Sequence, residues 1–222
     1  MFRDNISPLA QTNETRGRLA IFVDGASLFY AASELGIEID YIKLLCQLTD
    51  GATLLRAFFY TGVEKTLEKQ QRFLMWMRHH GYRVVTKEVV QQPDGSKKAN
   101  LEVEIAVDLM KLAPFYDTAV LVSGNGELAY AVEAVSYRGV RVELVSLRCM
   151  TSESLLNVCD RYIDLESLKE DIQKTRGISE RKIIKQPLLA FSRDRHERTD
   201  WLCDSHLMEA SATFAPSFPE PS

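Results

Sequence analysis

The sequence predicts an α/β fold in which helices cover both faces of a mostly parallel sheet. Short apolar runs rich in β-branched residues alternate with longer stretches that have helical periodicity. Two of these runs, residues 19–23 and 118–122, are apolar at nearly every position, as strands buried on both faces are. Gly81 and Gly139 follow helical stretches and mark where helices end. The usual size of such sheets predicts about five strands.

The expected elements follow one another without internal repeats. In the first half of the chain, we expect strands at 19–23, 53–60 and 82–90 and helices at 27–35, 41–48 and 64–80. Residues 91–96 contain proline, aspartate and glycine and are expected to form a loop. In the second half, we expect helices at 100–112, 127–138 and 152–158, strands at 118–122 and 140–145, and a closing segment at 162–173.

Length and composition predict one compact body with a tail at each end. The chain has 222 residues, and its hydrophobic fraction of 45% is enough for a sizeable core. Residues 1–17 are polar and are expected to form a flexible N-terminal arm. Residues 18–174 form the expected domain. Residues 175–222 begin with basic side chains, lack periodicity, and are expected to be a mobile C-terminal extension.

Charge and cysteine usage limit the classes of function. A net charge of -4 offers no general attraction for nucleic acid, so a polyanion site would need a local basic patch or a metal. The cysteines are widely spaced, and we expect buried thiols that form no disulfide: Cys46, Cys149, Cys159 and Cys203. No apolar run has the length of a membrane span or signal peptide, so we expect a cytoplasmic protein without a membrane anchor.

Carboxylates follow two of the predicted strands. Asp24 comes directly after residues 19–23, and Glu127 lies in a glycine-containing loop after residues 118–122. Open α/β sheets bind their ligands at the carboxyl ends of strands. Carboxylates brought together there repel one another and need a cation, a shared proton or a basic partner. The pattern therefore indicates a metal site.

Asp24 also has a simpler interpretation as a turn or cap residue. Gly25 and Ser27 follow it, so the segment forms a sharp strand-to-helix turn in which short polar side chains cap the helix. A dinucleotide site is disfavoured because G-x-G-x-x-G is absent. A phosphatase of the haloacid dehalogenase type is disfavoured because Ala26 stands where a second aspartate would be expected.

The predicted helix at 100–112 carries further acidic candidates. Glu102 shares a face with Ile105 and Leu109, and a carboxylate on an apolar face must find a partner or a metal. Asp108 is the second candidate on this helix. Glu104 is expected to be structural, because charged helical side chains usually belong to a solvated face.

Residues 123–127, with the sequence SGNGE, offer oxygen ligands in a tight turn. Two glycines let the backbone turn sharply, and Asn125 and Glu127 supply an amide and a carboxylate. Together with Asp24 and Glu102, they favour Mg²⁺ or Mn²⁺, which prefer oxygen ligands. The four histidines have no spacing typical of metal ligands.

At these motifs the sequence resembles the NYN domain family of PIN-like, ribonuclease-related domains, and within it the bacterial LabA-like group. The resemblance covers roughly residues 19–174 and rests on the segments FVDG, FFYTG, KKAN, EIAVD and LVSG, at 22–25, 58–62, 97–100, 104–108 and 121–124. It implies a Rossmann-like, three-layer α/β/α sandwich with a divalent-metal pocket at one end of a mostly parallel sheet. It also implies metal-dependent cleavage of RNA.

This chain departs from the family pattern at four site positions. The family commonly has aspartate at three of them, here Glu102, Asn125 and Glu127, and asparagine where this chain has Ser27. The pocket stays acidic, but Asn125 contributes no charge. The resemblance implies a catalytic set of Asp24, Glu102, Asp108, Asn125 and Glu127, all but Asp108 being ligands of Mg²⁺ or Mn²⁺, with Ser27 and Ser123 in support.

The leading functional hypothesis is a metal-dependent ribonuclease. Lys97 and Lys98 are expected to grip the RNA backbone, although ordinary solvated loop lysines explain them equally well. The alternative is a catalytically weakened module that acts as a regulatory or protein-interaction factor. The substituted acidic positions favour it, as does the C-terminal extension, through which a protein partner would bind.

Deletion of the chain from Arg176 onward tests the expected domain boundary. Because apolar periodicity fades there, the deletion should lower the melting temperature by less than about 2 °C. Thermal unfolding followed by circular dichroism measures this. A large loss of melting temperature would mean that the compact body extends beyond residue 174.

Overall fold

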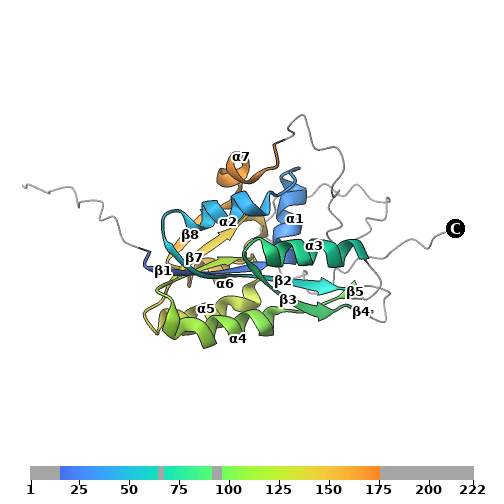
Figure 1. The fold of residues 1–222 in the computed structure, drawn as a ribbon. Helices are drawn as coiled ribbons and strands as arrows, with labels where there is room; N and C mark the ends of the chain where they lie inside the picture. The colour runs from blue at the N-terminus through green and yellow to red at the C-terminus, as the bar shows by residue number, and fades with distance from the viewer. Residues whose placement is uncertain (1–15, 65–67, 92–96, 176–222) are drawn as a thin grey trace, which may run out of the picture.

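A computed structural model describes residues 16–64, 68–91 and 97–175. Its core is a six-stranded sheet in the order β3-β2-β1-β6-β7-β8, with every neighbouring pair parallel (Figure 1). The strands are β1 (Arg18–Asp24), β2 (Thr53–Val63), β3 (Tyr82–Glu88), β6 (Thr118–Val122), β7 (Arg141–Ser146) and β8 (Arg161–Asp164). The sequence predicted about five strands. The additional edge strand, β8, has four residues, none of them fully buried, so it lacks a continuous apolar run.

Helices cover both faces of the sheet, which confirms the predicted three-layer α/β fold (Figure 1). On one face lie α1 (Gly25–Glu34), α2 (Tyr41–Thr49), α3 (Glu68–His79) and α7 (Lys169–Ile172). On the other face lie α4 (Glu102–Leu112), α5 (Ala129–Ser136) and α6 (Glu153–Leu156). Within β1, Ile21 and Val23 pack on the first face while Phe22 packs on the second, as the two-residue period of a strand requires.

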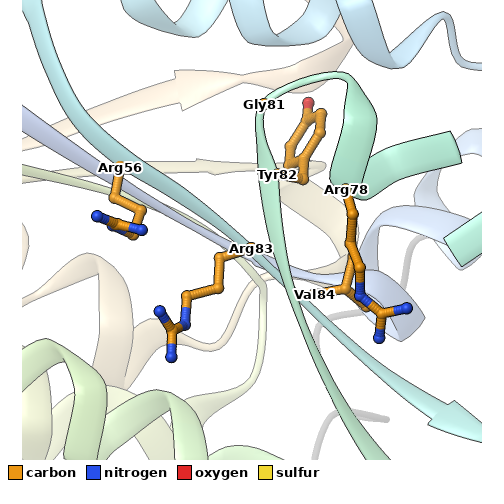
Figure 2. A pocket seen from close by; sticks show the side chains of 6 residues that line it. All are labelled: Arg56, Arg78, Gly81, Tyr82, Arg83 and Val84. Carbon is orange, nitrogen blue, oxygen red and sulfur yellow. The ribbon is translucent and has the colours of Figure 1, made fainter. Parts of the chain in front are cut away.

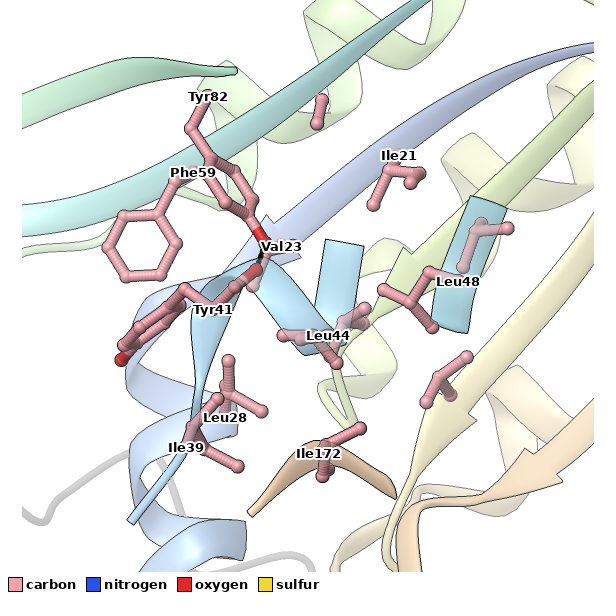
Figure 3. Packing of buried hydrophobic residues seen from close by; sticks show 14 of the residues in the cluster. Ile21, Val23, Leu28, Ile39, Tyr41, Leu44, Leu48, Phe59, Tyr82 and Ile172 are labelled. Carbon is pink, nitrogen blue, oxygen red and sulfur yellow. Dashed lines mark hydrogen bonds between the residues drawn. The ribbon is translucent and has the colours of Figure 1, made fainter. Parts of the chain in front are cut away.

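In the apolar core on the first face of the sheet, aromatic side chains pack against one another (Figure 3). Tyr41 and Tyr82 contact the ring of Phe59, and the Tyr82 hydroxyl donates to the Tyr41 carbonyl oxygen at 2.8 Å. This bond satisfies a buried hydroxyl and ties the start of β3 to α2. The edge strand β3 is therefore anchored in the core.

Several element boundaries differ from those that the sequence predicted. Residues 82–90 are not one strand, because β3 ends at Glu88 and a separate strand, β4 (Val90–Gln91), pairs antiparallel with β5 (Lys97–Lys98). The helix expected at 127–138 begins as a 3₁₀ turn. The closing segment 162–173 contains the end of β8, a 3₁₀ turn and α7. The short elements are β4 (Val90–Gln91), β5 (Lys97–Lys98), η1 (Ala113–Phe115), η2 (Gly126–Leu128), η3 (Arg148–Met150) and η4 (Leu165–Leu168).

The order of the strands creates a switch point between β1 and β6. From β1 the chain passes to β2 and β3 on one side of the sheet and then returns to β6 on the other. Val23 is paired with Val122, so Asp24 and Ser123 follow side by side at the carboxyl ends of the two strands. Open α/β sheets bind ligands in the crevice at such a point.

The exposure of the cysteines differs from what the sequence predicted. Cys46 and Cys149 are exposed and Cys159 is half-buried, so the expectation of buried thiols is wrong for these three, although none of them forms a disulfide. On α2, Leu44 and Leu48 take the core-facing positions and leave Cys46 toward solvent. Every helix in the described part of the chain is too short or too polar to serve as a membrane span.

A buried carboxylate joins the start of the domain to the sheet. Glu143 of β7 is 0% exposed and is surrounded by three arginines. Its Oε2 lies 2.8 Å from Arg16 Nη2, and its Oε1 lies 3.3 Å from Arg141 Nε and 3.8 Å from Arg161 Nη1. Arg16 also donates to the Thr49 carbonyl oxygen at 3.2 Å. The cluster therefore connects β7 and β8 to the end of α2.

Replacing Glu143 by glutamine should destabilise the fold. Three guanidinium groups would then face a neutral side chain, and breaking a buried pair costs about 3–5 kcal/mol in free energy of unfolding. Glu153→Gln is the matched control, because its pair with Arg148 is exposed and such pairs contribute less than about 1 kcal/mol. Urea unfolding measures both variants. Equal losses would mean that the Glu143 cluster is not structural.

Candidate functional site

Asp24 ends β1, caps α1 and stands at the switch point of the sheet. Its Oδ1 accepts from the backbone N–H groups of Ala26 at 3.1 Å and Ser27 at 3.3 Å. Its Oδ2 accepts from the hydroxyls of Ser27 at 2.6 Å and Ser123 at 3.0 Å. These four donors match the acceptor capacity of a carboxylate. A cation bound at Asp24 would therefore replace at least one hydroxyl.

The two serines link Asp24 to the loop after β6. Their hydroxyl oxygens lie 3.2 Å apart, and the backbone N–H of Asn125 donates to Ser123 Oγ at 3.2 Å. Ser123 is buried and Ser27 half-buried. The structure therefore places both of these sequence-predicted residues against the Asp24 carboxylate.

Asn125 bridges the loop and helix α4. Its Nδ2 donates to Glu102 Oε1 at 2.9 Å, and its Oδ1 accepts from the backbone N–H of Glu127 at 3.0 Å. The amide therefore uses both of its ends within the protein. It holds the Glu102 carboxylate in place and caps the 3₁₀ turn η2.

Glu102 has a buried oxygen without a partner. Its Oε2 is inaccessible to solvent and forms no hydrogen bond in the described part of the chain. Burial raises the pKa of Glu102, and the negative charges of Asp24 and Glu127 raise it further, while the charge of Lys98 and a backbone hydrogen bond oppose them. An unsatisfied carboxylate oxygen among like charges favours a cation or a proton at this position.

The loop that carries Asn125 lies directly against η3 and α6. A Cβ atom on Gly124 would lie 1.9 Å from the Met150 carbonyl oxygen, and one on Gly126 would lie 2.6 Å from Ser152 Oγ. The backbone N–H of Ser152 also donates to the Gly124 carbonyl oxygen at 3.0 Å. This close approach explains both glycines of the SGNGE segment, because a side chain on Gly124 would collide with the Met150 backbone and one on Gly126 with the hydroxyls of Ser152 and Ser154. It also fixes the position of Asn125.

Asp108 is bound by a different group, the hydroxyl of Tyr60. It accepts a hydrogen bond at 2.9 Å from the hydroxyl of Tyr60, which is paired with Asp24 across β1 and β2. Burial and the charge of Asp108 raise the pKa of Tyr60, so the hydroxyl stays a donor. Glu104 forms an ion pair with Lys87 at 2.8 Å, in line with the structural role expected for it. Tyr60 was not among the predicted site residues, although it lies in the FFYTG segment that carries the family resemblance.

Two of the remaining predicted residues, Glu127 and Lys98, lie close enough to Glu102 for their charges to act on it. Glu127 is exposed, and its charge reaches Glu102. Lys98 is half-buried in β5, and its charge lowers the pKa of Glu102. Lys97 is the neighbouring residue of β5, and its side chain lies outside the described part of the structure.

The donors at this site suit a hard cation. Asp24, Glu102 and Glu127 supply carboxylate oxygens, and the unpartnered oxygen of Glu102 needs positive charge. Among the described residues, however, no three histidine, cysteine or acidic side chains are gathered closely enough to hold one ion. The chemistry of the residues therefore fits Mg²⁺ or Mn²⁺, and coordination would require the long glutamate side chains to change rotamer.

A parallel sheet between two layers of helices, with acidic side chains at its switch point, defines a PIN-like α/β protein. The sequence model of the NYN domain matches residues 18–166, and the chain belongs to this family, which is ribonuclease-related. It is 34% identical over 166 residues to the low amplitude and bright protein LabA of Synechococcus elongatus, a match that covers 71% of this chain and 89% of LabA. These matches confirm the family expected from the sequence.

A solved structure supports the same fold. The crystal structure of a protein of unknown function from Vibrio parahaemolyticus superposes with a TM-score of 0.62 at 25% sequence identity. The similarity covers 72% of this chain and 98% of the Vibrio chain.

Glu102→Gln should stabilise the metal-free protein at about pH 7. The raised pKa of Glu102 means that the folded state binds its proton more tightly than the unfolded chain does. Wild-type stability therefore falls as pH rises from the ordinary value of 4.5 through the folded pKa. A neutral amide removes this loss and contributes about 1 kcal/mol at neutral pH.

Urea unfolding in chelator from about pH 4 to pH 8 measures the effect. The gain should disappear at the acidic end of the range, where the wild-type carboxyl is protonated. Glu133→Gln, on the neighbouring helix α5, is the control and should give no such gain. A variant with lower stability than the wild type at neutral pH would show that the Glu102 carboxylate is satisfied as it stands.

Proposed function

We propose that the protein is a divalent-metal-dependent ribonuclease that hydrolyses RNA phosphodiesters. The observation that carries this proposal is the buried, unpartnered oxygen of Glu102 beside the charges of Asp24 and Glu127 at the switch point of the sheet. Membership of the ribonuclease-related NYN family supports the reaction class. The cysteines that form no disulfide fit the reducing cytoplasm that we propose as its location.

Four residues would hold the cation: Asp24, Glu102, Glu127 and, through its amide oxygen, Asn125. A bound Mg²⁺ or Mn²⁺ would polarise the phosphate and lower the pKa of a water molecule so that it can attack phosphorus. Around the ion, Ser27 and Ser123 orient Asp24, and the amide nitrogen of Asn125 orients Glu102. Such supporting hydrogen bonds set ligand orientation and affinity.

Two further groups have roles around the crevice. Asp108, held by Tyr60 in the strand next to Asp24, would accept protons or order water near the reacting phosphate. Lys97 and Lys98 precede helix α4 and would contact the RNA backbone, which basic side chains position without reading its sequence.

A second candidate function is a catalytically weakened module that acts by regulation or protein interaction. Two observations favour it: four protein donors already occupy the Asp24 carboxylate, and Asn125 contributes no charge to the crevice. Such a module could bind RNA without cleaving it. The C-terminal extension, where a protein partner was expected to bind, lies outside the described residues.

Asp24→Asn should abolish metal binding and lower metal-dependent RNA cleavage by at least roughly 100-fold while the fold is kept. Asp40→Asn is a closely matched control, because Asp40 caps α2 through the same pattern, accepting from Ile42 N at 3.0 Å and Lys43 N at 3.2 Å. Calorimetric titration with Mn²⁺ and cleavage of single-stranded RNA, each with and without chelator, measure both variants. If both lose activity equally, Asp24 is only a cap.

Asn125→Asp should bind Mg²⁺ or Mn²⁺ more tightly and cleave single-stranded RNA faster at low metal concentration. The added charge offsets a divalent ion, and the volume of the side chain hardly changes. In chelator the same variant should be less stable than wild type by about 1–3 kcal/mol, because a carboxylate replaces the donor to Glu102.

The control for this prediction is Asn157→Asp, which adds the same charge at the C-cap of α6. It should change neither metal affinity nor cleavage. Equal or lower cleavage by Asn125→Asp at every metal concentration, with the fold preserved, would contradict the ribonuclease and favour the regulatory module.

A further inference from the structure

A hollow of about 480 Å³ at the edge of the sheet is lined by three arginines (Figure 2). Arg56 comes from β2, Arg78 from the last turn of α3, and Arg83 from the start of β3. Gly81, Tyr82 and Val84 complete its wall. Figure 2 shows the guanidinium groups placed around the edge strand β3. None of the lining residues is one of the predicted site residues, although the charge of Arg83 reaches Tyr60, which binds Asp108.

The core holds the wall of the hollow in place. Tyr82 is buried and donates its hydroxyl to Tyr41, so β3 begins at a defined position. Because successive side chains of a strand point to opposite faces, Arg83 points away from the core that Tyr82 and Val84 contact. The arginines are therefore held by anchored elements, Arg56 and Arg83 by strands β2 and β3, and Arg78 by the end of α3 on the face that Tyr82 and Val84 contact.

Among the described residues, these three arginines have no carboxylate partner, unlike several other arginines. In the described part of the structure, none of the three forms an ion pair, whereas Arg72 on the same helix as Arg78 pairs with Glu68. Three guanidinium groups around one hollow repel one another and favour an anion. A guanidinium presents paired N–H donors that match the oxygens of a phosphate group.

We propose that this hollow binds the phosphate groups of single-stranded RNA and leads the strand toward the acidic crevice. The choice of RNA rests on the proposed function. The strand register supports a path for the RNA from the hollow to Asp24. Arg83 is paired with Phe58 of β2, and two residues further along β2, Tyr60 is paired with Asp24. At the usual rise of a strand, Arg83 lies about 7 Å and Arg56 about 13 Å along the sheet from the level of Asp24.

The lining favours an RNA backbone over a free nucleotide. Its one aromatic residue, Tyr82, is only 3% exposed, so no ring is available to stack a base. The hollow offers positive charge from three elements and recognises phosphate alone. An RNA strand gains affinity from several phosphate contacts at once, whereas a mononucleotide makes few of them. Binding at this hollow is therefore independent of base sequence.

The test measures binding of a fluorescein-labelled oligouridylate of about twelve nucleotides by fluorescence anisotropy in chelator, where no metal-dependent cleavage occurs. The triple variant R56Q/R78Q/R83Q should bind at least about tenfold more weakly than wild type. The slope of log affinity against log salt concentration should fall by about 2, because each lost phosphate contact on single strands removes about 0.7.

Two controls separate local contacts from general charge. Arg72→Gln removes one charge from the same helix outside the hollow and should leave the affinity within about twofold of wild type. The triple Arg→Lys variant keeps the charges and should recover most of the salt slope but not all of the affinity, since lysine lacks the paired donors. Melting temperatures show that each variant is folded.

Unchanged RNA affinity and salt slope in the triple glutamine variant would overturn the proposal. So would equal competition by inorganic phosphate or uridine monophosphate at the oligonucleotide concentration, which would mean a small-anion site. Equal competition by oligoglutamate would assign the hollow to an acidic protein segment and would also overturn it.

The failure of this proposal and the failure of the ribonuclease are distinguishable. A loss of RNA binding in the triple variant, without any cleavage by the wild type, supports the hollow and contradicts the enzyme. Metal-dependent cleavage together with unchanged RNA binding in the triple variant supports the enzyme and contradicts the hollow.

Discussion

Repulsion among carboxylates at the switch point of the sheet is the constraint on which the rest of this site depends. The fold meets it in two different ways. Asp24 is satisfied by two backbone N–H groups and two hydroxyls. Glu102 accepts a hydrogen bond from the side chain of Asn125 at Oε1, and its buried Oε2 has no partner among the described residues. The crevice therefore has an uncompensated charge at Glu102, and a cation or a proton would relieve it.

Backbone packing, more than the acidic side chains themselves, holds this arrangement together. The carbonyl oxygen of Met150 lies where a side chain on Gly124 would be, so only glycine lets the loop after β6 pack this closely on η3, and the hydrogen bond from Ser152 N–H to the Gly124 carbonyl oxygen holds it there. Across the crevice, Glu102 is the first residue of α4, whose preceding residue Leu101 provides no side-chain cap. The N-terminus of a helix favours a negative charge, which partly offsets the burial of the carboxylate. The loop and the helix end thus bring Asn125 and Glu102 together.

The sequence predicted the layers of the fold and the approximate position of the crevice, because buried parallel strands are continuous apolar runs and β1 and β6 are two of them. It missed β8, whose half-exposed residues lack that signal. The contacts of Asn125 and Tyr60 depend on which side chains face one another across separate elements. The arginine hollow depends in the same way on strand register and a helix end. Residue types and spacing carry no information about such pairings.

The central claim is that the crevice between β1 and β6 binds a divalent cation through Glu102 and Asp24. Anomalous diffraction from crystals of the wild-type protein grown with Mn²⁺ tests it most directly, because the signal locates the metal itself. We expect one strong peak within about 2.5 Å of oxygens of both side chains, with Oε2 of Glu102 as a ligand. The absence of a peak there at saturating Mn²⁺, with Glu102 still bonded to Asn125, would contradict the claim.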